Sequence, residues 1–461
     1  MKIIIIGINH AGTSALRTLL KQNSDLDITA IDRSDNISFL GCGIALSVSS
    51  VVKDVDDLFY SNARELKNMG ANVLMKHEVV NIDTNAKTVT YINLNDEENP
   101  KKEYVESYDK LIYATGSSPI NLNLANSNAK NILLCKTYLD ALKIIEKSND
   151  ELIKSVAIIG AGYIGVELAE SFIIKNKKVS LIDAKDRVVA NYFDDELCYE
   201  LENAMNKNGV SLHLGAGVRG FEKNEAEFVT GVKTDAGIIK ADMVIVSVGA
   251  RPNTQLLPNA TKIANGAIIV DEYMKSSIPD VYVIGDSAAI FNTASKTFDN
   301  VALATNAVKG GIVSASNING IEIAKLKSVV GTNAIHIFGE NLSSTGINEK
   351  RCQDLKIDYK VVQWTDNDRP EFMNEFNKVT IRLIYEKNTL RLIGAQIHSR
   401  STKDTHMESI NMLALAIQKN MTIIDILTTD VFFLPHYNKP FNFIVSAILK
   451  ALDLCYLKEN Y

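Results

Sequence analysis

Short runs of β-branched apolar residues, each ending in a glycine-rich turn, recur in the first half of the chain. Such runs are typical of strands buried on both faces of a parallel sheet. An amphipathic stretch and then a second apolar run follow each turn. The pattern predicts strands at Lys2–Ile6, Asp27–Ile31, Ser155–Ile159 and Lys178–Ile182, and helices at Thr13–Lys21 and Val166–Lys175. Alternation of strands and helices predicts an α/β fold with parallel sheets.

The two turns have the composition of dinucleotide-binding loops. The first is Gly-Ile-Asn-His-Ala-Gly at residues 7–12, and the second is Gly-Ala-Gly-Tyr-Ile-Gly at residues 160–165. Glycines permit a tight turn and a close approach of the backbone to a pyrophosphate, which then faces the free N–H groups of the helix. Asp32 and Asp183 end the second strands, where a carboxylate can accept hydrogen bonds from ribose hydroxyls. The chain is therefore expected to hold two dinucleotides, although Asn9 replaces the middle glycine of the first turn.

Composition and charge narrow the class of protein. The 461 residues suggest about three domains. Hydrophobic residues make up 46% and charged residues 23%, which is typical of a globular protein. The net charge of −6, without a local basic patch, argues against binding to nucleic acid. The apolar run at the N-terminus is too short for a signal peptide, and Phe441–Leu457 is too short and too charged to span a bilayer, so a cytoplasmic protein without membrane association is expected.

Cysteine spacing argues against a disulfide scaffold and against a zinc site. The five cysteines are far apart in the sequence and odd in number, and none forms a C-x-x-C motif. They are Cys42, Cys135, Cys198, Cys352 and Cys455. No metal site is predicted, and the question left open is whether any one of the five is chemically active.

Further segments carry a resemblance to a known family. Leu111–Ser117 is a strand entering a Thr-Gly turn, Val246–Asn253 is a strand entering a Gly-Ala-Arg-Pro turn, and Val281–Asp286 is a strand ending in Gly-Asp. With the two glycine turns, and in this order, these segments resemble the FAD- and NAD(P)-dependent pyridine nucleotide–disulfide reductases. The resemblance implies a split FAD-binding domain (residues 1–117 and 250–325), an inserted NADH-binding domain (118–249) and a C-terminal α+β dimerisation domain (326–461). It also implies a homodimer or a higher homo-oligomer.

The same resemblance implies which residues bind the cofactors. For FAD they are Gly7, Asn9, His10, Ala11, Gly12, Asp32, Cys42, Ala114, Thr115, Gly116, Ser117 and Asp286. For NADH they are Gly160, Ala161, Gly162, Tyr163, Ile164, Gly165 and Asp183. Further cofactor contacts are expected at Tyr192, Gly249, Leu303, Ala304, Thr305, Gly346 and Phe433. Asp183 favours NADH over NADPH, because a carboxylate repels a 2′-phosphate.

Cys42 and His10 depart from the disulfide reductases and are the expected catalytic residues. Most of that superfamily has two cysteines a few residues apart, whereas Cys42 has no local partner. A single cysteine beside a flavin can cycle between thiolate and sulfenic acid, and a helix beginning near Gly43 would favour the thiolate. His10 could transfer protons beside Cys42. The alternatives are a small buried hydrophobic residue for Cys42 and a hydrogen-bonded helix-start residue for His10.

This pair resembles the single-cysteine subgroup, which comprises NADH peroxidases, water-forming NADH oxidases and coenzyme A-disulfide reductases. The segment Val431–Asn442 resembles the tail of the oxidases. The resemblance implies that NADH reduces FAD, that O2 forms a flavin hydroperoxide, and that the Cys42 thiolate reduces the released peroxide to water. NADH peroxidase, with H2O2 as substrate, is the first alternative, and coenzyme A-disulfide reductase is the second, disfavoured by His10. A flavin redox sensor that alters a partner remains a non-enzymatic alternative.

Overall fold

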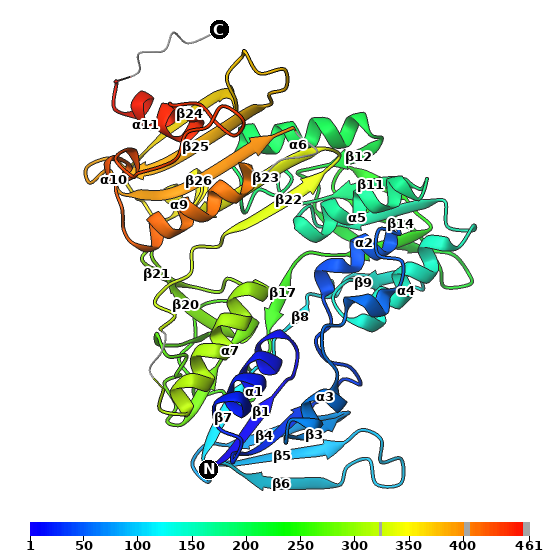
Figure 1. Ribbon diagram of the computed structural model, residues 1–461. Helices are drawn as coiled ribbons and strands as arrows, with labels where there is room; N and C mark the ends of the chain where they lie inside the picture. The colour runs from blue at the N-terminus through cyan, green and yellow to red at the C-terminus, as the bar shows by residue number, and fades with distance from the viewer. Residues whose placement is uncertain (322–324, 401–405, 455–461) are drawn as a thin grey trace.

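The computed structural model describes residues 1–321, 325–400 and 406–454. Three bodies make up the molecule (Figure 1), each built around a five-stranded sheet. The first contains the N-terminus, the second surrounds β10 to β16, and the third carries the C-terminal helices. Each sheet is large enough to bury its own apolar core.

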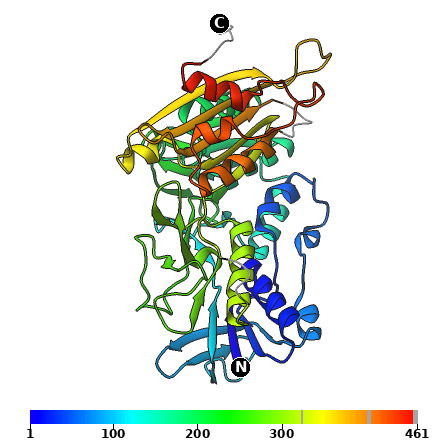
Figure 2. The ribbon, with the colours of Figure 1, turned by 60° about the vertical axis from the view of Figure 1, so that its left-hand side comes forward.

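The first sheet has the strand order β19-β7-β1-β2-β3, with every neighbouring pair parallel. Its strands are β1 (Lys2–Ile6), β2 (Asp27–Asp32), β3 (Asn72–Met75), β7 (Lys110–Tyr113) and β19 (Val281–Val283). Ile3, Ile4 and Ile5 are fully buried, as their continuous apolar run predicts. Helices α1 (His10–Gln22) and α7 (Ala304–Ile318) lie side by side against this sheet (Figure 2).

The second sheet has the order β12-β11-β10-β16-β9 and is also entirely parallel. Its strands are β9 (Ile132–Leu134), β10 (Ser155–Ile159), β11 (Lys178–Ile182), β12 (Val210–His213) and β16 (Met243–Val246). Its helices are α4 (Tyr138–Asn149), α5 (Tyr163–Ile174) and α6 (Asp195–Lys207). Both sheets therefore confirm the predicted α/β class, and each has its glycine turn directly after the central strand.

Both helices after the glycine turns begin earlier than their apolar periodicity predicts. Helix α1 begins at His10 instead of Thr13, and α5 begins at Tyr163 instead of Val166. The first turn of each helix thus lies inside the glycine motif. Periodicity misses it because Gly12 and Gly165 interrupt the apolar repeat in each first turn, although both glycines are buried.

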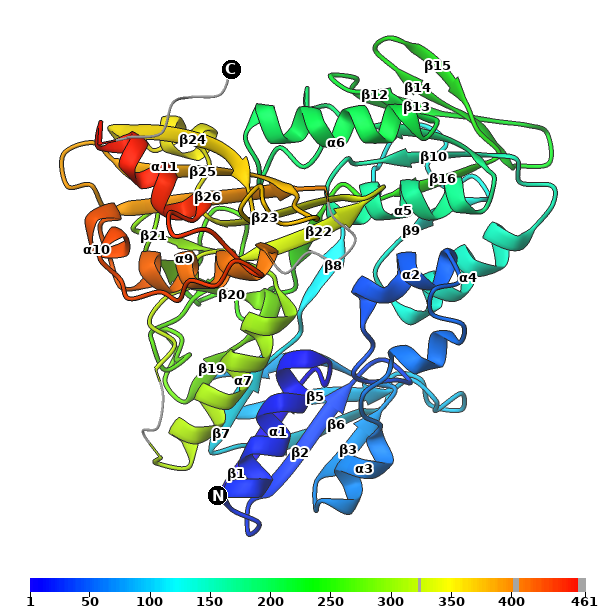
Figure 3. The same ribbon diagram turned by 45° about the horizontal axis from the view of Figure 1, so that its top comes forward.

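Two short antiparallel strands join the first body to the second (Figure 3). Strand β8 (Ser117–Pro119) carries the chain out and β17 (Ala250–Pro252) carries it back, and the two are paired along their length. As a result, β7 and β19 lie in one sheet although the whole second sheet lies between them in sequence. This topology agrees with a split first domain, while the exact domain bounds remain a prediction.

The C-terminal sheet is antiparallel, with the order β22-β23-β26-β25-β24. Its strands are β22 (Asn333–Ile337), β23 (Glu340–Gly346), β24 (Tyr359–Asn367), β25 (Lys378–Glu386) and β26 (Leu392–Ser399). The alternating apolar residues of Val379–Ile384 and Leu390–Ile397 predict antiparallel strands, and these are β25 and β26. The amphipathic pattern of His406–Gln418 predicts a helix, which the structure shows as a 3₁₀ turn (His406–Glu408) followed by α9 (Ser409–Gln418). The expected α+β character is confirmed.

Smaller elements complete the described chain. Three further sheets comprise β4 (His77–Asp83), β5 (Thr88–Asn93) and β6 (Glu103–Ser107); β13 (Val218–Lys223), β14 (Val229–Thr234) and β15 (Gly237–Lys240); and β18 (Ile268–Ile269), β20 (Ala288–Asn292) and β21 (Thr297–Asp299). The remaining helices are α2 (Ile44–Val48), α3 (Ala63–Asn68), α8 (Glu349–Asp354), α10 (Ile423–Leu427) and α11 (Phe443–Ala451), with 3₁₀ turns at Gly41–Gly43, Val55–Leu58 and Gly285–Ser287.

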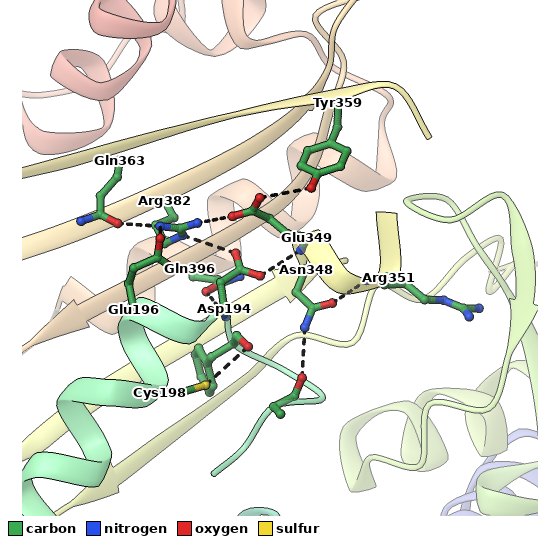
Figure 4. Close-up of polar contacts among 12 residues, drawn as sticks. Asp194, Glu196, Cys198, Asn348, Glu349, Arg351, Tyr359, Gln363, Arg382 and Gln396 are labelled. Carbon is green, nitrogen blue, oxygen red and sulfur yellow. Dashed lines mark hydrogen bonds and ion pairs between the residues drawn. The ribbon is translucent and has the colours of Figure 1, made fainter. Parts of the chain in front are cut away.

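A buried polar network joins the second body to the C-terminal sheet (Figure 4). Asp194, at the N-terminus of α6, accepts hydrogen bonds from the Glu349 N–H (2.9 Å) and the Gln396 amide (2.8 Å). Arg382 on β25 pairs with Asp194 (3.3 Å), with Glu196 (2.9 Å) and with Glu349. The side chains of Arg382 and Asp194 are 4% and 5% exposed, so each depends on the other for charge compensation.

Candidate functional site

The first glycine turn has the geometry of a phosphate-binding loop. Gly7 has φ +91°, and a Cβ there would lie 2.3 Å from the carbonyl oxygen of Ala114. No side chain caps the N-terminus of α1 at Asn9, so the first N–H groups of the helix face the turn. Asp32 accepts hydrogen bonds from the N–H groups of Ile8 (2.7 Å) and Ser34 (2.8 Å), which fixes its carboxylate beside the turn.

The second turn repeats this arrangement. Gly160 has φ +108°, and a Cβ there would lie 2.4 Å from the carbonyl oxygen of Ser247. Asp183 accepts hydrogen bonds from the N–H groups of Ala161 (2.6 Å) and Lys185 (2.8 Å). Helix α5 also lacks a side-chain cap, and the space around the Cα of Gly162 is open. The two turns therefore have the same backbone arrangement, in which an uncapped helix lies beside a fixed carboxylate, as in pyrophosphate-binding loops.

The residues expected to bind FAD beyond the turn come together at the carboxyl ends of β7 and β19. The Ser117 hydroxyl donates to Asp286 (2.6 Å), and Thr115 donates to the carbonyl oxygen of Asn253 (2.6 Å). Lys136 donates to Ser117 (2.5 Å) and pairs with Asp286 (3.1 Å). A fixed carboxylate and an ammonium group thus lie beside the Thr-Gly turn. Gly116, with φ +66°, has open space around it.

His10 is the first residue of α1 and is partly buried. Its Nδ1 lies 2.9 Å from the hydroxyl oxygen of Tyr60. Burial lowers the pKa of His10, while the charge of Asp286 acts to raise that pKa and the charge of Lys136 acts to lower it. The imidazole is therefore neutral near neutral pH and can both accept and donate a proton.

Cys42 lies in the 3₁₀ turn Gly41–Gly43, directly before α2, and is exposed. A Cβ at Gly43 would lie 2.3 Å from the Leu58 side chain, so this glycine allows the loop to pack closely. Burial of the sulfur, followed by the charge of Glu167, raises the pKa of Cys42. The helix start expected beside Cys42 is present, since α2 begins at Ile44. The shift of the thiol pKa is opposite in direction to the one that a helix start produces.

The other predicted contacts lie in three places. Tyr163 and Tyr192 contact each other, with ring centroids 4.4 Å apart, and Tyr163 hydrogen-bonds to Asn333 of the C-terminal body. Leu303 caps α7, followed by Ala304 and Thr305, and Gly249 directly precedes β17. Gly346 ends β23, and Ile164 is exposed on α5. Phe433 lies on an exposed segment between α10 and α11, 49% exposed in the single chain.

Sequence reasoning missed four polar residues at this site. They are Tyr60, Lys136, Glu167 and Asn253. Each is close to a predicted residue only through the fold, and Tyr60, Lys136 and Glu167 belong to no recognisable local motif. Of the four, Asn253 gave a signal, since it ends the strand-to-turn segment already identified, and its amide also donates to the carbonyl oxygen of Thr115 (3.0 Å).

Within residues 1–321, 325–400 and 406–454, no group of three or more His, Cys, Asp or Glu side chains is placed to hold a metal ion. None of the helices in those ranges combines the length and apolar character that a bilayer crossing needs.

Comparison with known proteins gives the class. Residues 1–311 match the model of the pyridine nucleotide-disulphide oxidoreductase family, and residues 334–442 match the dimerisation domain of the same family. The chain belongs to the pyridine nucleotide-disulphide oxidoreductases. This assignment confirms the resemblance inferred from the two glycine turns and the strand-end motifs.

Particular members of the family are similar over the whole chain. An NADH oxidase of Mycoplasma genitalium is 48% identical, over 99% of this chain and 98% of its own length. The structure of a water-forming NADH oxidase from Lactobacillus brevis bound to NADH is 36% identical, with a TM-score of 0.93 and 98% of each chain covered. An engineered mutant of that oxidase, described as a water-forming NADPH oxidase bound to NADPH, is 35% identical, with a TM-score of 0.92 and the same coverage.

Proposed function

We propose that the protein is an FAD-dependent NADH oxidase that reduces O2 by four electrons to water. Two NADH, one O2 and two protons give two NAD⁺ and two water molecules. The observation that carries the proposal is that Cys42 is the exposed thiol of the described chain, while Cys135, Cys198 and Cys352 are buried. A lone accessible thiol cannot form an internal disulfide but can reduce a peroxide. The whole-length similarity to NADH oxidases supports the same conclusion.

The first glycine turn and its surroundings fit FAD. A pyrophosphate would lie on the uncapped N-terminus of α1, and Asp32 would accept from the adenosine ribose. Ser117 and Asp286, already hydrogen-bonded to each other, would hold the ribityl chain. FAD, when bound, supplies the two-electron exchange between NADH and oxygen.

The second turn fits NADH. Asp183 uses two of its lone pairs on the N–H groups of Ala161 and Lys185, which leaves acceptor capacity for ribose hydroxyls. A 2′-phosphate at the same place would meet a fixed negative charge, so the site favours NADH over NADPH. Tyr163 and Tyr192 lie directly beside this turn and would flank the bound dinucleotide.

Cys42 and His10 would complete the reduction. Because burial raises the pKa of Cys42, its thiol must lose a proton before it attacks, and the neutral imidazole of His10 is suited to accept that proton. The sulfur then bonds to one peroxide oxygen, the O–O bond breaks, and the second oxygen takes the proton and leaves as water. The sulfenic acid at Cys42 is reduced by the second NADH and one proton, which releases the second water.

The assembly and location are also proposals. The dimerisation domain supports a homo-oligomer, most simply a homodimer. Its apolar contacts would include the exposed side chains of Phe432, Phe433 and Leu434. We place the enzyme in the cytoplasm, with NADH and O2 as its small-molecule substrates.

Oxygen-electrode stoichiometry tests the function. The FAD-loaded enzyme should consume two NADH per O2, and added catalase should release no oxygen. The Cys42→Ser variant should still oxidise NADH but consume one NADH per O2 and release H2O2. Cys352→Ser is the matched control, because Cys352 is buried in α8. Oxygen uptake that is absent until H2O2 is supplied as the oxidant would identify a peroxidase instead, and water formation by Cys42→Ser would contradict the role of the thiol.

A further inference from the structure

His10 has a structural partner that no sequence motif identifies. Tyr60 lies on the segment between the 3₁₀ turn Val55–Leu58 and α3. Its ring stacks on the imidazole of His10, with ring centroids 5.6 Å apart and planes inclined by 12°. The hydroxyl oxygen of Tyr60 lies 2.9 Å from Nδ1 of His10. Stacking and a hydrogen bond together define both the plane and the rotation of the imidazole.

The segment that carries Tyr60 is itself fixed. The Ser38 hydroxyl donates to the carbonyl oxygen of Ser61 (2.8 Å) and accepts from the N–H of Ser61 (2.9 Å), and both contacts are buried. Arg17 on α1 donates to the Ser61 hydroxyl (3.1 Å) and pairs with Glu65 (2.5 Å). Tyr60 is therefore held against α1 by contacts on the residue that follows it.

A cavity of about 210 Å³ opens beside the pair. Its lining includes His10, Tyr60, Thr13, Ser14 and Arg17, with Val308 of α7 on the opposite side. Tyr60 is 40% exposed, so its hydroxyl has His10 on one side and solvent on the other. The Tyr60 hydroxyl thus connects water in the cavity to Nδ1 of His10, so that a proton can pass from the water to Tyr60 and from Tyr60 to His10.

Both members of this hydrogen bond are neutral near neutral pH. The imidazole is neutral because burial lowers the pKa of His10, and burial raises the pKa of Tyr60, which therefore keeps its proton. The charged groups around the pair are Asp286 and Lys136 on the side of His10, and Arg17, with its partner Glu65, on the side of Tyr60. Where the Tyr60 hydroxyl is the donor, Nδ1 is the acceptor and the remaining proton of the ring lies on Nε2.

We propose that Tyr60 is a positioning residue that fixes His10 as the Nε2–H tautomer and supplies it with protons from the cavity. The proposal rests on the proposed function. When the sulfenic acid of Cys42 is reduced, its S–O bond breaks and the oxygen leaves with the Nε2 proton of His10 as water. Nδ1 takes the proton of Tyr60, and Tyr60 regains one from water in the cavity, which leaves Nε2 free. In the next turnover Nε2 accepts the proton of the Cys42 thiol, Nδ1 returns its proton to Tyr60, and Tyr60 releases one to the cavity, which restores the Nε2–H tautomer. Each reduction of the sulfenic acid consumes one solvent proton, and the electrons come from NADH.

Tyr60→Phe tests the proposal, because it keeps the stacked ring and removes only the hydroxyl. Tyr138→Phe is the matched control, since the Tyr138 hydroxyl donates to Asp56 (2.8 Å) on a neighbouring surface. In the FAD-loaded enzyme, anaerobic reduction by NADH should be unchanged in both variants. Aerobic turnover of Tyr60→Phe should fall about tenfold, with a shifted pH profile. Adding Tyr60→Phe to His10→Gln should cause no fall beyond that of His10→Gln alone. Wild-type turnover and pH profile in Tyr60→Phe would overturn the proposal.

A second measurement does not depend on turnover. Nitrogen-15 NMR of labelled histidine, with the His10 signals assigned by His10→Gln, reports which ring nitrogen carries the proton. The wild-type signals should identify the Nε2–H tautomer, and Tyr60→Phe should shift the Nδ1 signal toward that of a nitrogen without a donor. If the wild type consumes no O2, the proposed function fails, yet these signals still decide the tautomer. A wild-type Nδ1–H tautomer would overturn the inference even in an active oxidase.

Discussion

Asp32 and Asp183 form a matched pair, and the choice between NADH and NADPH should depend on Asp183 alone. Each carboxylate accepts two backbone N–H groups, one from its glycine turn and one two residues further on. Substitution by asparagine removes the charge but keeps one acceptor oxygen for the turn. Asp183→Asn should therefore keep the bond from the Ala161 N–H, lose the one from the Lys185 N–H, and change how the turn meets a ribose.

The size of the change in dinucleotide preference follows from the hydrogen bond between Asp183 and the ribose, which the substitution weakens. A hydrogen bond to a charged acceptor contributes about 1.5–3 kcal/mol, which corresponds to roughly a 10- to 150-fold change in affinity. Repulsion of a 2′-phosphate by Asp183 is lost at the same time. The ratio of kcat/KM for NADH to that for NADPH should therefore fall by at least about 10-fold in Asp183→Asn.

Steady-state kinetics with both dinucleotides measures this ratio, and Asp32→Asn is the control. Asp32→Asn should leave the NADH/NADPH ratio unchanged and should instead lower the FAD content of the purified protein. A ratio that stays at the wild-type value in Asp183→Asn would refute the assignment of Asp183 to the ribose. A ratio that falls equally in Asp32→Asn would refute the assignment of the two turns to different dinucleotides.

Three further predictions concern stability. Burial raises the pKa of Glu167 to about 7, above its unfolded value of 4.5, so the folded protein should lose stability as pH rises between these two values. Glu167→Gln should flatten this decline, which thermal unfolding curves recorded from pH 5 to pH 8 measure. Arg382→Met leaves buried Asp194 without its cation and should cost about 3–5 kcal/mol, seen as a lower midpoint in urea; an unchanged midpoint would show that the network contributes nothing. Gly346 has φ +77°, and a Cβ there would lie 2.1 Å from the Ile393 carbonyl oxygen, whereas Gly339, at φ +83°, has open space around it. Gly346→Ala should therefore lower the melting temperature more than Gly339→Ala.

The nucleotide-binding turns could be predicted from the sequence because their signal is local. A buried strand, a glycine turn and an acidic residue follow one another within a short stretch of sequence. The fold then needs only to place the acidic residue beside the glycine turn. The bond from the Ala161 N–H to Asp183 is of this kind. The antiparallel strands of the C-terminal sheet were equally accessible, because alternation along β25 is a local pattern.

The surroundings of Cys42 and His10 could not be predicted in this way. Tyr60 reaches His10, and Lys136 reaches Asp286, through contacts between segments that are distant in sequence. The pKa shift of Cys42 depends on contacts of the same kind. The local sequence indicates a helix start beside Cys42, whereas burial of the sulfur and the charge of Glu167, on a helix of the second body, decide the result.

The paired strands β8 and β17 have a consequence for how this chain could have been assembled. Ser117 pairs with Pro252 and Pro119 with Ala250, so the two ends of the intervening segment leave the first body at one place. A segment whose ends are adjacent can be added, removed or replaced as a unit without moving the ends of its host. A chimaera that exchanges the segment between β8 and β17 for that of a relative should therefore keep the first sheet intact and acquire the donor's dinucleotide preference.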